Sequence, residues 1–334
     1  MALTFRLGQD SGQFMRPARS KNEYAMRIAI MGSGGLGGYY GGMLARAGED
    51  VTFIARGAHL EAIRADGLTV KLPSGEEFTL DAKATNDSSE IGPVDLVLFC
   101  VKTYDTDAAA EQIRPTVGPE TMIASIQNGV DNGERIEKFS GAGHFVPGVS
   151  YVNGLIEKPG VIFVRSAHMT SFGEMNGSLT PRIEQLVKSF HHAGIDVESR
   201  TDMQSFLWEK FVAICGVGGA EILARQSMGP VLATPETKDL LVGLLQEVVV
   251  VAHGVGANLS PELPDQLVEF ASNNVPPTHR SSMFLDLLEE KRLEVESLNG
   301  TVVRLGREQG VDTPLNFAVY AALKPYENGG LETL

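Results

Sequence analysis

Three glycines at the spacing G-x-G-x-x-G are the first residues of this chain with an evident chemical use. Gly32, Gly34 and Gly37 lie between an apolar run, residues 27–31, and a helical pattern that ends at Gly48. Glycines in this order allow a tight turn, a close approach of the backbone to a pyrophosphate and close packing of helix on strand. The N–H groups at the start of the helix would point at the phosphates. We therefore predict a dinucleotide site whose loop consists of Gly32, Ser33, Gly34, Gly35, Leu36 and Gly37.

A single arginine indicates which dinucleotide this site would hold. The second apolar strand, residues 51–55, is followed by Arg56, where an NAD site would carry an acidic residue for the ribose 2′-hydroxyl. A guanidinium suits a 2′-phosphate instead, so the sequence predicts NADPH as the cofactor. The alternative is that Arg56 is a solvated residue at a strand end.

Two further polar side chains follow buried strands of the same half. Lys102 comes after the strand predicted at residues 94–101, and Asn128 comes after the one at residues 122–126. Ligands of open α/β sheets bind beyond the carboxyl ends of the strands, so both residues are placed to meet a cofactor or a substrate oxygen. A surface lysine at the start of a loop, and an Asn-Gly turn formed with Gly129, explain the same residues without a site.

Lys210 is the candidate proton donor. It is one ionisable residue in a long, mostly apolar helical stretch, residues 203–224. Burial there would lower its pKa, and a donor that titrates nearer neutrality transfers a proton more readily to a developing alkoxide. The alternative is a lysine that extends its amine out of an amphipathic helix into water.

A second polar cluster lies farther along the chain. Ser282 could hydrogen-bond a substrate carboxylate or hydroxyl, and Glu294 could orient Lys210 or bind the ribose of a nicotinamide. Considered singly, Ser281 suits a helix N-cap and the glutamates suit a solvated face. The histidines have no metal-binding spacing, and neither a Ser-His-Asp arrangement nor a nucleophile elbow is present.

The elements that must position these residues form two patterns. Strands alternate with helices up to about residue 200, and residues 144–172 continue the sheet with a hairpin connection at residues 154–160. Beyond that point the pattern is helical, at residues 203–224, 236–255, 261–272, 283–292, 295–308 and 315–323. The fold class is therefore α/β: a flexible extension at 1–25, a Rossmann-like dinucleotide-binding domain at 26–200, and a mainly helical substrate and dimerisation domain at 201–334, with a cleft between the two domains.

The composition limits the partners. The chain of 334 residues has a formal net charge of −14, which argues against nucleic acid and against an anionic membrane surface. No apolar run approaches the roughly 20 residues that cross a bilayer. Cys100 and Cys215 lie far apart in apolar segments, which favours buried reduced thiols in a cytoplasmic protein over a disulfide. The apolar helices of residues 201–334 are compatible with a homodimer.

Taken together, these stretches resemble the ketopantoate reductase family over nearly all of the chain from Met26 onward. The likeness is carried by IAIMGSGGLGGYYGGMLARAG, the arginine of FIARG, the lysine of FCVKTYD, IQNG, LWEKF, and RSSMFLDL followed by LEVESLNG. It implies NADPH-dependent reduction of a 2-oxo acid, foremost 2-dehydropantoate to pantoate in pantothenate biosynthesis. The resemblance assigns the proton donor to Lys210, cofactor contacts to Arg56, Lys102, Asn128 and Glu294, and a substrate contact to Ser282.

Three places depart from the pattern of this family. Ile214, the pair Gly218 and Gly219, and His279 stand where residues with side-chain amides are expected. Loss of these amides would remove hydrogen bonds to ketopantoate, so the sequence predicts a shift toward a bulkier or less polar 2-oxo substrate. Two alternatives are a related NADP-dependent reductase of another 2-oxo or hydroxy acid, and an NADP-binding sensor without turnover. The presence of Lys210 and Glu294 argues against the sensor, which would need neither.

Overall fold

Short apolar strands build the N-terminal half of the computed structural model, which describes residues 25–330. The strands are β1 (Arg27–Met31), β2 (Asp50–Ile54), β3 (Leu68–Lys71), β4 (Glu77–Leu80), β5 (Lys83–Thr85), β6 (Leu96–Phe99), β7 (Met122–Ser125), β8 (Phe145–Lys158), β9 (Val161–Phe172) and β10 (Val197–Ser199). Within the described residues they form a 10-stranded sheet in the order β4-β3-β9-β8-β7-β6-β1-β2-β5, with β10 beside β9. All neighbours from β8 to β5 are parallel, whereas β8–β9 and β3–β4 are antiparallel.

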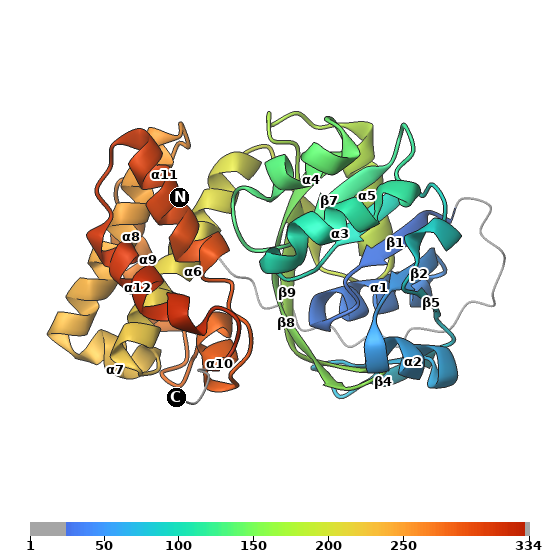
Figure 1. Cartoon of the computed structure of the whole chain (residues 1–334), viewed down its shortest axis with the longest axis horizontal. Helices are drawn as coiled ribbons and strands as arrows, with labels where there is room; N and C mark the ends of the chain where they lie inside the picture. The colour runs from blue at the N-terminus through green and yellow to red at the C-terminus, as the bar shows by residue number, and fades with distance from the viewer. Residues whose placement is uncertain (1–24, 331–334) are drawn as a thin grey trace.

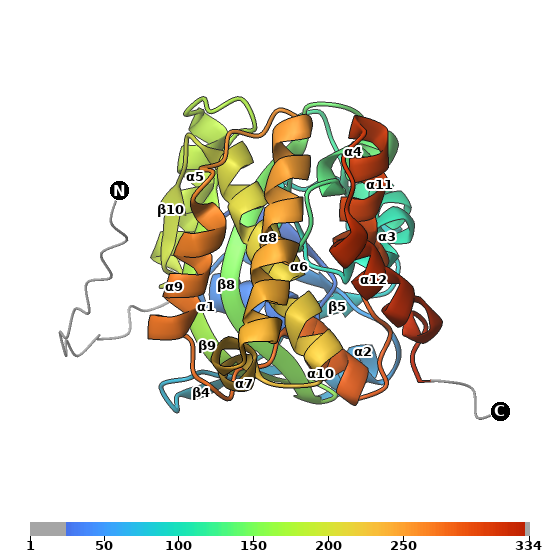
Figure 2. The ribbon, with the colours of Figure 1, turned by 90° about the vertical axis from the view of Figure 1, so that its left-hand side faces the viewer.

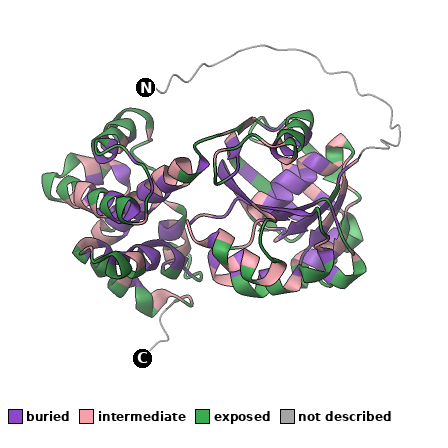
Figure 3. Ribbon diagram, turned by 90° about the horizontal axis from the view of Figure 1, so that it is seen from above, coloured by how far each residue is buried: buried purple, intermediate pink, exposed green. Residues whose placement is uncertain are grey.

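Helices cover both faces of this sheet because its strands are apolar on both sides. Ile28 and Ile30 pack with residues of α1 (Gly35–Ala47) and α5 (Pro181–His192). Ala29 and Met31, which alternate with them along β1, pack with α3 (Thr106–Gln112) and α4 (Asn132–Ser140) on the other face. Figure 3 shows the buried sheet enclosed by helices that are exposed on their outer sides. α2 (Gly57–Asp66) follows β2.

The C-terminal half is helical and is organised around α6 (Met203–Ala224), which is apolar on most sides. A Cβ on Gly216 would collide with Leu245, so this glycine lets α8 (Pro235–Gly254) pack directly on α6. Figures 1 and 2 show α6 between the sheet and the other helices. The remaining helices are α7 (Met228–Ala233), α9 (Leu263–Asn274), α10 (Ser282–Leu288), the π-helix η4 (Glu296–Gly300), α11 (Thr301–Gln309), α12 (Pro314–Leu323) and the short η5 (Lys324–Tyr326).

The predicted fold class is confirmed: an α/β N-terminal domain with a largely parallel sheet precedes a helical C-terminal region. The predicted hairpin connection at 154–160 is wrong, because β8 runs on to Lys158 and only Pro159 and Gly160 separate it from β9. The helix predicted at 295–308 is divided into η4 and α11, and α4 and α7 were not predicted. The predicted extension, residues 1–25, lies outside the described residues except for Ala25. In the described part of the chain, no helix is both long and apolar enough to cross a membrane.

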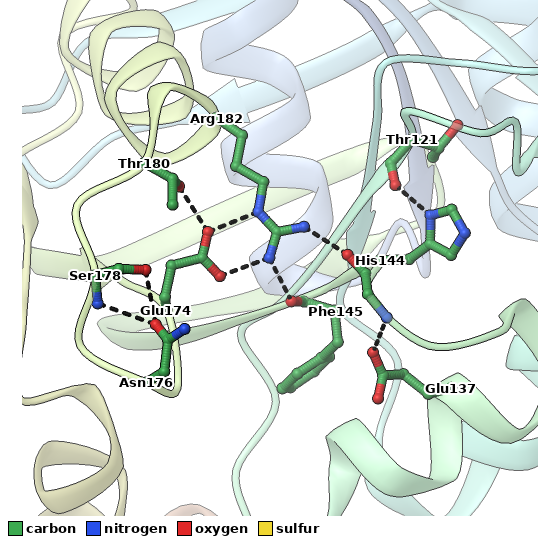
Figure 4. Close-up of polar contacts among 10 residues, drawn as sticks. Thr121, Glu137, His144, Phe145, Glu174, Asn176, Ser178, Thr180 and Arg182 are labelled. Carbon is green, nitrogen blue, oxygen red and sulfur yellow. Dashed lines mark hydrogen bonds and ion pairs between the residues drawn. The ribbon is translucent and has the colours of Figure 1, made fainter.

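An ion pair between Arg182 of α5 and Glu174, which follows β9, joins this helix to the sheet (Figure 4). Arg182 donates from Nε and Nη2 to the two carboxylate oxygens of Glu174, at 2.7 and 2.5 Å. It also donates to the carbonyl oxygens of Gly143 and Phe145, at 2.6 and 3.4 Å. Hydrogen bonds from Arg182 are the main cause that lowers the pKa of Glu174. This single side chain therefore holds the start of β8 and the end of β9 against α5.

Candidate active site

A cleft of about 1050 Å³ lies between the N-terminal sheet and the C-terminal helices. Ligand pockets have volumes of roughly 300–1,000 Å³, so this one is large enough for an extended cofactor and a small substrate. All the candidate site residues from the sequence line it except Gly37; they are Gly32, Ser33, Gly34, Gly35, Leu36, Arg56, Lys102, Asn128, Lys210, Ser282 and Glu294. The fold thus gathers residues from both halves of the chain around one space.

The glycine loop lies at the point where the strand order of the sheet reverses. β1 is flanked by β2 on one side and β6 on the other, and ligands of open α/β sheets bind beyond the strand ends at such a point. Gly32 has φ +92°, and a Cβ there would lie 2.7 Å from Val101 Cγ1. A Cβ on Gly37 would collide with the carbonyl oxygen of Gly32, whereas one on Gly34 would meet nothing within 4 Å. The turn is therefore tight on the protein side and open toward the cleft, which fits a pyrophosphate.

Arg56 lies at the N-cap of α2, on the rim of the cleft. Its Nη2 is 2.8 Å from Asp105 Oδ2, and its side chain is 86% exposed. Arg292, from the C-terminal half, approaches the other oxygen of Asp105 at 3.4 Å and stacks 4.2 Å from the centre of the Tyr104 ring. Two guanidinium groups and one carboxylate therefore meet at this rim, and the net positive charge suits an anionic group.

Lys102 and Glu294 join the two halves across the cleft. Lys102 Nζ donates to Asp286 at 2.8 Å and to Glu294 at 3.0 Å, and Glu294 also accepts from the N–H and hydroxyl of Thr103 at 3.0 and 2.9 Å. Burial opposes the charge on Lys102, but the two carboxylates outweigh it and raise its pKa. Burial likewise opposes the charge on Glu294, but Lys102 and Thr103 outweigh it and lower its pKa. Both groups therefore stay charged at neutral pH.

Lys210 reaches the cleft from α6. Its Nζ donates to the carbonyl oxygen of Ser150 at 2.9 Å and lies 5.5 Å from the centre of the Tyr151 ring. Burial lowers its pKa from 10.5 to about 8, although the charge of Glu294 acts in the opposite direction. The described side chains of Lys210 and Glu294 form no hydrogen bond with each other, so Glu294 does not orient Lys210 in the way the sequence suggested. The carbonyl of Ser150 holds the ammonium instead.

Ser282 and Asn128 line the cleft from different halves of the chain, one at the start of α10 and the other after β7. Ser281 is the N-cap of α10, because its hydroxyl accepts from the N–H of Phe284 at 3.4 Å. This agrees with the capping alternative for Ser281 and leaves Ser282 as the first residue of the helix. The backbone carbonyl oxygen of Asn128 accepts a hydrogen bond from the side-chain amide of Asn132 at 2.9 Å.

The three departures from the family pattern lie away from the cleft lining. Ile214 packs against the helical core. A Cβ on Gly218 would lie 3.5 Å from the hydroxyl of Ser281. His279 Nδ1 lies 3.1 Å from a carboxylate oxygen of the fully buried Glu221. None of these described positions offers an amide side chain.

Several residues of the site were not predicted from the sequence. Asp286 is four residues after Ser282 on α10, so helical spacing could have placed it on the same face. Thr103 and Asp105 lie one and three residues after Lys102, beyond the carboxyl end of β6, where polar residues are candidates for ligand binding. Ser150 contacts Lys210 through its backbone carbonyl, which every residue has, so no signal in the sequence marks this contact. Cys100, predicted to be buried, is partly exposed and lines the cleft as a free thiol.

A glycine turn between β1 and α1 at the reversal of strand order defines a dinucleotide-binding protein of the Rossmann type. The family model described as ketopantoate reductase PanE/ApbA matches residues 28–177, and the model described as ketopantoate reductase PanE/ApbA C terminal matches residues 202–327. The chain belongs to the ketopantoate reductase family, whose members are oxidoreductases that act on CH–OH groups with a nicotinamide dinucleotide.

Three known proteins show how far this similarity extends. The 2-dehydropantoate 2-reductase of Halobacterium salinarum is 30% identical over 292 residues, which cover 87% of this chain and 95% of that protein. The crystal structure of 2-dehydropantoate 2-reductase from Geobacter metallireducens is 33% identical, has a TM-score of 0.82 and covers 90% of this chain and 99% of its own. A D-mandelate dehydrogenase solved with NADH and anilino(oxo)acetate has a TM-score of 0.82 at 20% identity, over 90% of this chain and 98% of its own, and shares the fold.

Proposed function

We propose that this chain reduces a 2-oxo acid with NADPH, that 2-dehydropantoate is its substrate, and that Lys210 is the general acid. The observation that carries this proposal is the cleft in which an amine with a pKa of about 8 and the glycine loop face the same space. In this proposal residues 26–200 bind the cofactor, and residues 201–334 supply Lys210 and Ser282 and mediate a homodimer. Cys100 and Cys215 are free thiols, which supports a location in the reducing cytoplasm.

The choice of NADPH rests on Arg56. Its guanidinium lies at the end of β2, where the adenosine ribose is bound in proteins of this fold. Arg292 adds a second positive charge near the same point. A 2′-phosphate would replace Asp105 as the partner of Arg56, and a bare ribose diol would give the guanidinium no comparable partner.

The residues of the cleft have separate roles in this reaction. NADPH, when bound, supplies a hydride to the 2-oxo carbon. Lys210 is charged at pH 7 and donates a proton to the oxygen of that carbon, and the carbonyl of Ser150 keeps its amine in place meanwhile. Glu294 and Lys102, which hold the two halves together, would bind the cofactor, while Asn128 and Ser282 would bind the polar groups of the substrate.

The test is the oxidation of NADPH in the presence of a panel of 2-oxo acids. Wild type is compared with Lys210→Ala and with Lys188→Ala, a matched control on an exposed position of α5 outside the cleft lining. We expect turnover of 2-dehydropantoate, a loss of about 100-fold or more in Lys210→Ala, and no change in the control. Binding of NADPH without turnover of any acid would refute the proposal and indicate a sensor.

The second candidate is reduction of a less polar 2-oxo acid. It is favoured by Ile214, Gly218 and His279, which lie behind the residues that line the cleft. Ile214 is one turn of α6 after Lys210, and a Cβ on Gly218 would lie 3.5 Å from the hydroxyl of Ser281, the neighbour of Ser282. Loss of amides at these positions would act on substrate choice through Lys210 and Ser282, and would weaken discrimination in favour of a polar substrate. Turnover confined to 2-oxo acids that have no hydroxyl group, aromatic or aliphatic, with none of 2-dehydropantoate, would establish this candidate in place of the first.

A further inference from the structure

The imidazole of His59 connects three segments beside the glycine loop. His59 lies in the first turn of α2 and lines the cleft. Its Nε2 is 2.8 Å from the carbonyl oxygen of Ser33, and its Nδ1 is 3.1 Å from the backbone nitrogen of Gly160. Gly160 lies in the two-residue connection between β8 and β9. The ring therefore joins α2, the glycine loop and the β8–β9 hairpin.

These two contacts define the tautomer of the ring. A backbone N–H only donates, so Nδ1 must accept from Gly160. A carbonyl oxygen only accepts, so Nε2 must carry a proton and donate it to Ser33. Both bonds are present together only when the ring is neutral. Burial lowers the pKa of His59 and so favours that form, although the bond to Ser33 acts in the opposite direction.

The bond to Ser33 acts on the part of the loop that faces the cleft. Because a peptide is planar and trans, its carbonyl oxygen and the N–H of the next residue point in opposite directions. Holding the Ser33 oxygen toward His59 therefore turns the N–H of Gly34 away from His59. Gly34 is the loop residue at which an added Cβ would meet nothing within 4 Å. Backbone N–H groups at such a position bind phosphate.

The β8–β9 hairpin supports the loop from a second direction. A Cβ on Gly35 would collide with the carbonyl group of Gly154, so the start of α1 lies directly on β8. The same strand carries Ser150, whose carbonyl holds Lys210. The hairpin thus contacts the loop directly at Gly154 and indirectly through His59 and Gly160.

We propose that His59 is a positioning residue that orients the Ser33–Gly34 peptide for binding of the cofactor's phosphates, through donation from Nε2 to Ser33. The inference rests on the proposed function, because it takes the cleft to bind NADPH. The role is separable from stability, because the two ring nitrogens have different partners and only one of them touches the loop.

Two substitutions at His59 separate the hydrogen bond of Nε2 to Ser33 from that of Nδ1 to Gly160. His59→Gln can place an amide N–H near the position of Nε2 and keep the bond to Ser33, whereas His59→Asn can keep only an acceptor near Nδ1 for Gly160. His144→Ala is the control: it removes another imidazole–carbonyl bond, from Nδ1 to the Thr121 oxygen at 2.8 Å (Figure 4). His144 directly precedes β8 and does not line the cleft.

The experiment measures the Kd for NADPH by fluorescence titration, kcat at saturating NADPH, and the Tm of each variant. We expect His59→Asn to raise Kd about 5-fold with little change in kcat, His59→Gln to stay near wild type, and His144→Ala to lower Tm without changing Kd. Equal Kd values for the Asn and Gln variants would overturn the inference and leave the proposed function intact. A wild type that binds no nicotinamide dinucleotide would overturn the proposed function, and this inference with it.

Discussion

Raising the pH from 7 to 9 is expected to lower kcat/KM for reduction about 10-fold, because Lys210, the acid in the proposed function, donates a proton only when it is protonated. With a pKa of about 8, about 0.9 of the enzyme carries a charged Lys210 at pH 7 and about 0.1 at pH 9. A lysine with the ordinary value of 10.5 would remain almost fully charged over this range. The lowering corresponds to about 3 kcal/mol of differential interaction and comes chiefly from burial in the cleft.

Three other groups that line the cleft, Cys100, Lys102 and His59, titrate outside this window. Burial raises the pKa of Cys100, and the carboxylates that face Lys102 raise its pKa despite burial. Burial lowers the pKa of His59 below 6.5. A fall in rate between pH 7 and 9 is therefore assigned to Lys210.

The assay is the initial rate of NADPH oxidation at subsaturating 2-oxo acid, measured at half-unit steps of pH for wild type and for Lys210→Arg. Because kcat/KM reports the free enzyme, the fall should be centred near pH 8. An arginine stays charged over the whole range, so the variant should be slower but should not show this fall. A flat wild-type profile, or the same fall in Lys210→Arg, would refute the assignment of Lys210 as the acid.

Three further substitutions test other parts of the structure. Arg56→Ala is expected to weaken binding of NADPH about 10-fold more than binding of NADH in fluorescence titrations, and equal losses would contradict the assignment of NADPH. Asp105→Asn is expected to raise the ratio of the Kd for NADH to the Kd for NADPH about 3-fold, because the carboxylate 2.8 Å from Arg56 competes with a 2′-phosphate. An unchanged ratio would show that Asp105 does not compete with the phosphate. Arg182→Ala is expected to lower the free energy of unfolding in urea by about 2 kcal/mol at pH 7. Arg182 lowers the pKa of Glu174 below 4.5, so the stabilisation by this ion pair is present above pH 4.5 and is lost as the pH falls through the folded-state pKa of Glu174. A difference in unfolding free energy between wild type and variant that stays constant into acid would exclude the ion pair as its source.

Local sequence signals determined the parts of this protein that depend on neighbours in the chain. The spacing of Gly32, Gly34 and Gly37 depends on the geometry of one turn and one helix, and the apolar run of β1 depends on burial of both its faces. The helix predicted at 203–224 has the same bounds as α6. Each of these signals lies within a short segment, so the sequence alone was enough to place the glycine loop and Lys210 on their elements.

The partners of the site residues were decided by the tertiary structure alone. Lys102 and Glu294 are 192 residues apart, His59 and Gly160 are 101 apart, and Lys210 and Ser150 are 60 apart. β8 continues through Gly154, a residue that ordinarily weakens a strand, because its length is set by pairing with β9 and its glycine is needed where the strand meets Gly35. Side-chain identity and periodicity report burial and local conformation, whereas these contacts arise only when the sheet and the helices close on one another.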